Sequence, residues 1–147
     1  MSKLFRQLSP WVIVGILLGD AGAVAANPRR PELPGYTTEG RRCLTAGTAA
    51  AGNISTMQEC AQEEFTRQDK RLNQVFRAAI DKASSRERKK LRASERAWLR
   101  TLDFHVHRCT APWDPTGREY SFQYISCKVT LTIARTEWLQ RHYSLRR

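Results

Sequence analysis

The chain has 147 residues, with 25 lysines and arginines against 14 aspartates and glutamates, and a formal net charge of +11 at pH 7. This length fits one domain with a modest core, and the charge favours acidic or polyanionic partners without indicating a fold. Beyond the N-terminal region no stretch is apolar enough to cross a membrane, so we expect no transmembrane segment in the mature chain.

The N-terminus is typical of an export signal. Lys3 and Arg6 precede a short apolar run at residues 11–18, and small residues follow at 23–26. The run is shorter than the ~20 residues that a membrane-spanning helix needs. We therefore predict a signal peptide over residues 1–26 and a mature protein that is periplasmic or secreted, with an uncleaved N-terminal anchor as the alternative.

Residues 27–54 are predicted to form an extended arm followed by a loop. Pro28, Pro31 and Pro34 fix the backbone φ angle and lack an N–H donor, so residues 27–40 are expected to be extended and poorly ordered. Residues 41–53 are small and polar around Cys43. We expect a loop or a single turn there, held down by that cysteine.

Residues 55–143 are predicted to be helical. Ser55 or Thr56 fits a capping box at the start of a first helix, and apolar side chains at three- and four-residue spacing continue to about residue 83. Ser84, followed three residues later by Glu87, fits a second capping box, so a second helix is expected from there to about Cys109. The short connection makes the two helices antiparallel.

A third helix is predicted after the proline-rich break at residues 111–117. Thr116 and Glu119 have the spacing of a cap, and apolar residues recur helically from Phe122. The β-branched residues between 129 and 136 lower helix propensity, which leaves a strand as the alternative for that stretch. The predicted fold class is therefore all-α, an antiparallel helical hairpin plus a third helix, stapled by two disulfides.

Four cysteines in an exported chain indicate two disulfides. Folding the hairpin about residues 84–85 places Cys60 level with Cys109, with Cys43 and Cys127 near the same pole. The local pairs Cys43–Cys60 and Cys109–Cys127 are favoured because they close the shortest loops, and each would stabilise the fold by about 3 kcal/mol. Pairing Cys60 with Cys109 and Cys43 with Cys127 remains the alternative.

We find no pattern that predicts a metal, a cofactor or an enzyme. There is no C-x-x-C pair, and His105 and His107 point to different sides of a helix. No nucleophile motif or phosphate-binding loop is present. Carboxylates on helices are expected to pair with arginine or face solvent rather than to act as a glycosidase pair; those considered are Glu63, Glu64, Asp69 and Asp103.

The densest run of positive charge lies at residues 86–92. Its candidate binding residues are Arg86, Arg88, Lys89 and Lys90. Cations near a helix N-terminus oppose the helix dipole, so an external anion would explain their position. The candidate ligands are an anionic glycan or a lipid surface rather than a specific nucleic acid sequence, and a solvated helix start is the plainer interpretation.

Several motifs resemble those of the LprI-type lysozyme-inhibitor family. The segment Thr56-Met57-x-x-Cys60, followed by Asp69 and Leu72-Asn73, resembles T-x-x-M-x-x-C…D-x-x-L-N-x-x-Y of that family. Residues 95–98 with Asp103 resemble Q-R-A-W-x-x-x-R-D. The closing elements of the resemblance are Cys109, Cys127, Thr132 and Arg135. Leu102 and Phe76 depart from the pattern by replacing an arginine and a tyrosine, and Cys109 comes three residues later than usual.

The resemblance implies an exported binding protein that occludes the substrate cleft of a lysozyme-like or other wall-lytic enzyme. Arg108, Trp113 and Arg118 near the cysteine pole are the candidate contacts, because arginine pairs well with carboxylates. A strongly basic lysozyme would be repelled by this chain, so we expect an acidic or bacterial wall-lytic enzyme as the target.

Five residues are expected to have structural roles. Asp69 and Asn73 lie four apart on one helix face and are expected to bond across the hairpin to Arg96 or Arg100. Trp98 lies in the apolar stripe of the second helix and is expected to fill the core. Asp103 and Arg135 are included because of the family resemblance.

Overall fold

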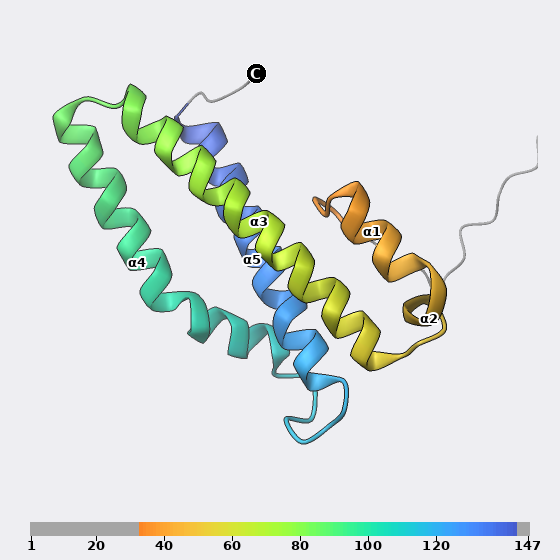
Figure 1. Ribbon diagram of the computed structural model, residues 1–147. Coiled ribbons are helices and arrows are strands. Elements are labelled where there is room, and N and C mark those ends of the chain that lie inside the picture. Colours follow the sequence, from red (N-terminus) through yellow and green to blue (C-terminus); the bar gives the residue numbers. More distant parts are fainter. Residues whose placement is uncertain (1–32, 144–147) are drawn as a thin grey trace, which may run out of the picture. The chain divides into compact units, whose positions relative to one another are not determined.

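The computed structural model describes residues 33–143, which are helical over 81% of their length and contain no strand (Figure 1). The helices are α1 (Thr38–Thr45), α2 (Gly47–Ala50), α3 (Ile54–Lys82), α4 (Ser85–Thr110) and α5 (Tyr120–His142). The predicted all-α fold with an antiparallel hairpin, a third helix and two disulfides is confirmed. The predicted signal peptide, and residues 27–32 of the predicted arm, lie outside the described residues.

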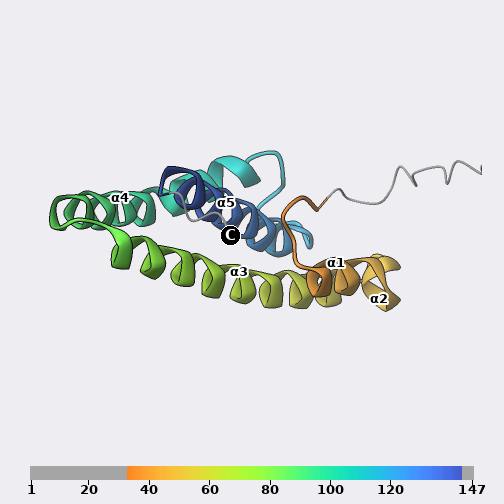
Figure 2. The ribbon, with the colours of Figure 1, turned by 90° about the horizontal axis from the view of Figure 1, so that it is seen from above.

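Helix α5 is the central element of the fold. Helices α3 and α4 diverge from the turn that joins them, and α5 packs against both (Figure 1), while α1 and α2 lie along the N-terminal half of α3 (Figure 2). Val129, Thr132, Ile133 and Thr136 of α5 are all buried. Their β-branched side chains suggested a strand, but packing on two sides outweighs their weak helix propensity.

The buried apolar residues form two clusters, and α5 contributes to both. In the first, Val129 and Ile133 pack beneath α1 and the start of α3; its other members are Tyr36, Leu44, Ala49 and Cys60. The second lies toward the α3–α4 turn and consists of Leu72, Ala79, Leu91 and Leu139. Trp98 is half-buried against this second cluster, as its place in the apolar stripe predicts.

The segment from Leu33 to Asn53 differs from its prediction. It holds two short helices in place of a loop or single turn, and its N-terminal part is packed rather than extended. Tyr36 is only 6% exposed. Gly35 has φ of +78°, and a Cβ atom there would lie 2.6 Å from Ile133 Cγ2, so both conformation and space require glycine. Helices of eight and four residues are too short to be stable by themselves, so their formation depends on tertiary contacts that the sequence does not reveal.

Two of the predicted helix caps are wrong and one is confirmed. Asn53 caps α3 by accepting a hydrogen bond from Thr56 N at 3.0 Å, in place of Ser55 or Thr56. The Ser84–Glu87 capping box at the start of α4 is present. Helix α5 begins at Tyr120 and has Glu119 as its N-cap without a side-chain hydrogen bond, so Thr116 lies too early to cap it; the Thr116 hydroxyl donates to Asp114 within the loop.

The disulfides join neighbouring helices in the predicted local pairs. Cys43–Cys60 links α1 to α3 with a Cα–Cα distance of 5.6 Å. Cys109–Cys127 links the end of α4 to α5 with a Cα–Cα distance of 6.1 Å. The alternative pairing between distant segments is therefore excluded. Both bonds lie away from the α3–α4 turn, so that the turn end of the fold depends on non-covalent contacts.

One buried ion pair joins α4 to α5 in that non-covalent region. Arg135, only 8% exposed, donates through Nε (3.0 Å) and Nη2 (2.8 Å) to Glu95 Oε2. Nη2 also donates to the Ser94 hydroxyl at 3.0 Å. The guanidinium carbon lies 4.5 Å from the ring centre of Trp138 and 5.8 Å from that of Trp98. Carboxylate, hydroxyl and aromatic rings thus compensate a cation that has lost its water.

We predict that Glu95→Ala lowers the free energy of unfolding by about 3 kcal/mol, because Arg135 would remain buried without its carboxylate. Urea unfolding monitored by circular dichroism measures this. The matched control is Glu137→Ala, which removes the exposed pair with Arg141 at 3.5 Å and should cost less than about 0.5 kcal/mol. Equal losses in the two variants would contradict a special role for the buried pair.

Candidate functional site

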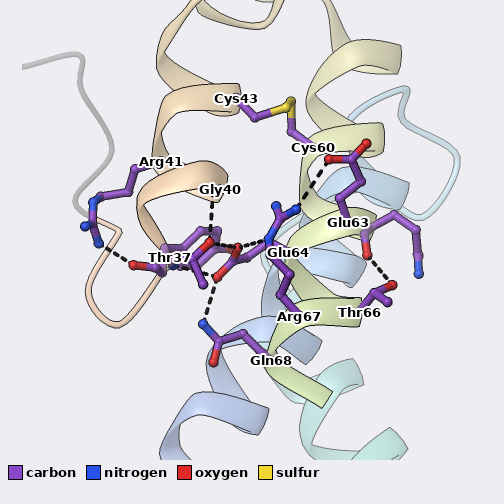
Figure 3. A network of polar contacts seen from close by, with 12 residues as sticks. Thr37, Gly40, Arg41, Cys43, Cys60, Glu63, Glu64, Thr66, Arg67 and Gln68 are labelled. Atoms are coloured by element: carbon purple, nitrogen blue, oxygen red, sulfur yellow. Dashed lines mark hydrogen bonds and ion pairs between the residues drawn. A yellow bond between two sulfur atoms is a disulfide. The ribbon is translucent and has the colours of Figure 1, made fainter. Parts of the chain in front are cut away.

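The most deeply buried carboxylate of the described residues is Glu64 on α3, whose side chain is fully buried (Figure 3). It accepts hydrogen bonds from Thr37 N at 2.8 Å and from the Thr37 hydroxyl at 2.5 Å. It also accepts from Gln68 Nε2 at 2.7 Å and from Arg67 Nε at 2.9 Å. Two of these four bonds come from the segment that precedes α1.

The environment of Glu64 suits a docking residue and not an acid–base catalyst. Burial by itself would raise the pKa of Glu64, but the hydrogen bonds from Thr37, Gln68 and Arg67 outweigh it and hold the pKa below its ordinary value. A carboxylate that stays ionised and is covered by Thr37 cannot deliver a proton to a substrate. Gly40 packs directly on it, and a side chain there would overlap the carboxylate. Glu64 therefore attaches the N-terminal segment to α3.

The predicted contacts at the cysteine pole lie on and beside the loop that joins α4 to α5 (Figure 1). The Cys109–Cys127 bond closes this loop at its base. Within it, Gly117 N donates to Asp114 O at 2.9 Å, and Tyr120 N donates to Gly117 O at 3.1 Å. Hydrogen bonds from the amide and then the hydroxyl of Thr116 hold the pKa of Asp114 below its ordinary value. The loop is thus fixed by a covalent bond and consecutive turns.

Arg118 of this loop lies against the start of α3. Together they line a hollow of about 420 Å³ whose other residues are Thr48, Ala51, Gly52, Asn53, Ile54 and Ser55. Arg118 is exposed and Trp113 is half-buried in the same loop. An arginine beside a helix N-terminus favours an anionic group, because the guanidinium and the first amides of the helix are both positive.

A second hollow, of about 550 Å³, shares Ser55 with the first and was missed by sequence reasoning. It runs along α3 beside Ile125, and its remaining residues are Gln58, Glu59, Gln62, Glu63 and Thr66. These residues recur at three- and four-residue spacing on one helix face, so the face could be predicted from the sequence. The sequence could not show that α5 lies along one side of this face.

The structure separates the remaining binding candidates. Arg108 is exposed near the end of α4, with its guanidinium carbon 5.8 Å from the Phe104 ring centre. Arg86, Arg88, Lys89 and Lys90 are exposed in the first turns of α4. At 1.5 Å per residue, Arg86 and Arg108 are about 33 Å apart along the helix. One ligand site cannot include both groups.

The residues that were expected to have structural roles lie in different environments. Asn73 donates to Asp69 at 3.1 Å within α3, and both are exposed, so the predicted bonds from this pair to Arg96 or Arg100 are wrong: the four-residue spacing on one helix satisfies them locally. Asp103 is exposed on α4. The pKa of Tyr124 on α5 is raised above its ordinary value, mainly because Tyr124 is partly buried and secondly because of the negative charge of Asp103. Arg135 is the buried α4–α5 link.

Among residues 33–143, no group of three His, Cys, Asp or Glu side chains is placed to hold a metal ion. No helix in that range combines the length and the apolarity needed to cross a membrane.

Comparison with known proteins gives one family. The family model described as lysozyme inhibitor LprI matches residues 45–139, most of the chain. The chain belongs to the LprI lysozyme-inhibitor family. No curated protein and no solved structure matches it. The resemblance read from the helix motifs is thereby confirmed, and an inhibitor family with two disulfides is consistent with an extracytoplasmic, non-catalytic protein.

The boundaries of the LprI match divide the Glu64 network. Glu64 and Cys60 lie inside the matched range, whereas Thr37, Gly40 and Cys43 precede it. The N-terminal segment of this LprI protein is thus joined to the matched domain by one disulfide and one buried carboxylate.

We predict that Glu64→Gln lowers the free energy of unfolding by about 2 kcal/mol at neutral pH, because hydrogen bonds to a charged group are lost. The ionised form is favoured by folding, so its contribution is present above the ordinary carboxyl pKa of 4.5 and is lost as the pH falls through the lower folded value. The gap between wild type and variant should therefore narrow in acid. Urea unfolding at neutral and acidic pH tests this, with the exposed Glu63→Gln as control; a gap independent of pH would contradict it.

Proposed function

We propose that this LprI protein inhibits a wall-lytic enzyme by binding in its substrate cleft. The family assignment carries the proposal. We further propose that residues 1–26 are removed on export and that the mature protein acts in the periplasm or after secretion. The two disulfides support an oxidising location.

The ordered loop between α4 and α5 is the proposed insertion element. A loop held by a disulfide and by its own turns loses little conformational entropy on binding, which favours affinity. Trp113 supplies an aromatic contact, and Arg118 supplies a cation beside the positive start of α3. Enzymes that cleave glycosidic bonds use paired carboxylates in their clefts, and these are suitable partners for Arg118.

The charge of the protein restricts the choice of target. A partner of the same sign is repelled at long range, and the full chain carries +11, or +10 once Lys3, Arg6 and Asp20 are removed with residues 1–26. We therefore propose an acidic or bacterial wall-lytic enzyme as the target rather than a strongly basic lysozyme.

We predict that Arg118→Ala raises the inhibition constant by about 30-fold, because it removes one partner of an ion pair formed on binding. The decrease in turbidity of a cell-wall suspension, with an acidic wall-lytic enzyme, measures this. Arg77→Ala on α3 removes the same charge from an exposed site and should leave inhibition nearly unchanged. Inhibition of none of the tested enzymes by wild type would refute the proposal.

We also predict that the double substitution Cys109→Ser and Cys127→Ser weakens inhibition more than Cys43→Ser with Cys60→Ser. The first pair releases the base of the proposed insertion loop, whereas the second releases α1. The two bonds span 17 and 18 residues, so their effects on stability should be similar, about 3 kcal/mol each. Inhibition assays at a temperature where both variants are folded separate the two roles, and equal inhibition by both would argue against the loop.

A further inference from the structure

Helix α4 is the least covered of the three long helices. Only Leu91, Val106 and Thr110 of its 26 residues are buried. It packs on α5 through one side, with Trp98 and Leu102 half-buried there. The opposite side lies free in the described part of the chain.

The exposed side of α4 has a distinctive composition. At about 100° per residue, Lys89, Arg96, Arg100 and Phe104 project away from the side that holds Leu91 and packs on α5. All four are exposed, and Phe104 is 59% exposed, one of two large hydrophobic residues so exposed among the described residues. Ala93 and Ala97, both exposed, lie between the cations.

The cations of this row have no acidic partners among the described residues. Across residues 33–143, no carboxylate lies within 4.0 Å of Lys89, Arg96 or Arg100; the ion pairs involve Arg67, Arg135 and Arg141. Arg92, Arg96 and Arg100 follow one another at four-residue spacing, at which like charges repel. An anionic surface laid along the helix would relieve that repulsion.

We propose that this outward row of α4 (Lys89, Arg96, Arg100 and Phe104) docks the protein on the surface of an anionic phospholipid bilayer. The row from residue 89 to 104 extends about 22 Å along α4 at 1.5 Å per residue, long enough for its three cations to contact one surface together. The small residues between the cations let headgroups approach, and each cation near such a surface strengthens binding.

Phe104 favours a bilayer over a soluble polyanion. A charged polymer would engage the three cations but gain nothing from an aromatic ring turned to solvent. At a bilayer the ring can enter the interface between headgroups and acyl chains, where aromatic side chains are favoured. The row is also distinct from the proposed insertion loop, so this inference does not depend on the proposed inhibition.

The test is flotation of the whole mature protein with vesicles. We expect binding to vesicles of phosphatidylglycerol and phosphatidylcholine in equal parts, weakening as salt is added, and no binding to phosphatidylcholine alone. The triple variant Lys89→Gln, Arg96→Gln and Arg100→Gln should lose about 100-fold in affinity, since each cation contributes several-fold. Phe104→Ala should lower affinity for vesicles several-fold but leave retention on heparin resin unchanged.

The matched control changes the same number of charges elsewhere. Lys70, Arg71 and Arg77 are exposed on α3, and their replacement by glutamine should cost much less than replacement of the α4 row. Unchanged circular dichroism verifies that both variants fold. Equal losses in the two triple variants would assign binding to net charge and overturn the proposal. Retention on heparin without vesicle binding would assign the row to a soluble polyanion, and binding of neither ligand would also overturn it.

Discussion

The arrangement of this LprI protein depends on α5 being buried on two sides. Helices α3 and α4 are joined by a tight turn but diverge from it, so that within residues 33–143 the helix that connects them along their length is α5. Most of its buried side chains are small or β-branched, with Arg135 and Leu139 as the exceptions, which permits close approach of both neighbours. Cys109–Cys127 fixes one end of the α4–α5 contact, and the Arg135–Glu95 pair holds it closer to the α3–α4 turn. The positions of the α4–α5 loop and of the outward row of α4 therefore depend on the packing of α4 against α5.

A second constraint is the burial of Glu64. An ionised carboxylate without water is costly unless its oxygens are fully hydrogen-bonded, and Thr37 supplies two of the four bonds. The buried charge of Glu64 therefore needs the hydrogen bonds from the segment before α1, and that segment is in turn held on α3 by Glu64. The Cys43–Cys60 bond lies one turn of α3 away and limits how far the segment can separate. The hydrogen bonds to Glu64 and the Cys43–Cys60 disulfide together hold the segment before α1, and α1 itself, against α3.

These constraints leave two surfaces with different chemistry. The loop between α4 and α5 is held by the Cys109–Cys127 bond and by consecutive turns, with Arg118 beside a helix N-terminus, which suits insertion into an acidic cleft. The outer side of α4 is long and carries an exposed ring and cations that form no ion pair among residues 33–143, which suits a broad anionic surface. The two surfaces lie on different parts of α4 and its following loop, so that an inhibitor held at a bilayer could still present the loop to an enzyme.

The sequence by itself determined the helical class, the hairpin about residues 84–85 and the family, and it favoured the local disulfide pairs that the structure then confirmed. These follow from short-range signals: apolar spacing, a capping box, the loop lengths between cysteines, and motifs within single helices. Even the Asn73–Asp69 bond belongs to this class, since four-residue spacing within one helix suffices to form it.

Only the tertiary structure decided the rest, because the missing partners are far apart in the chain. Glu64 reads as one more surface carboxylate until Thr37, 27 residues earlier, covers it. Arg135 gains its role from Glu95, 40 residues away, and the β-branched run of α5 is helical because two helices pack on it. The α4 row likewise became visible only when α5 was found to occupy the other side of that helix, since exposure is a property of neighbours and not of spacing.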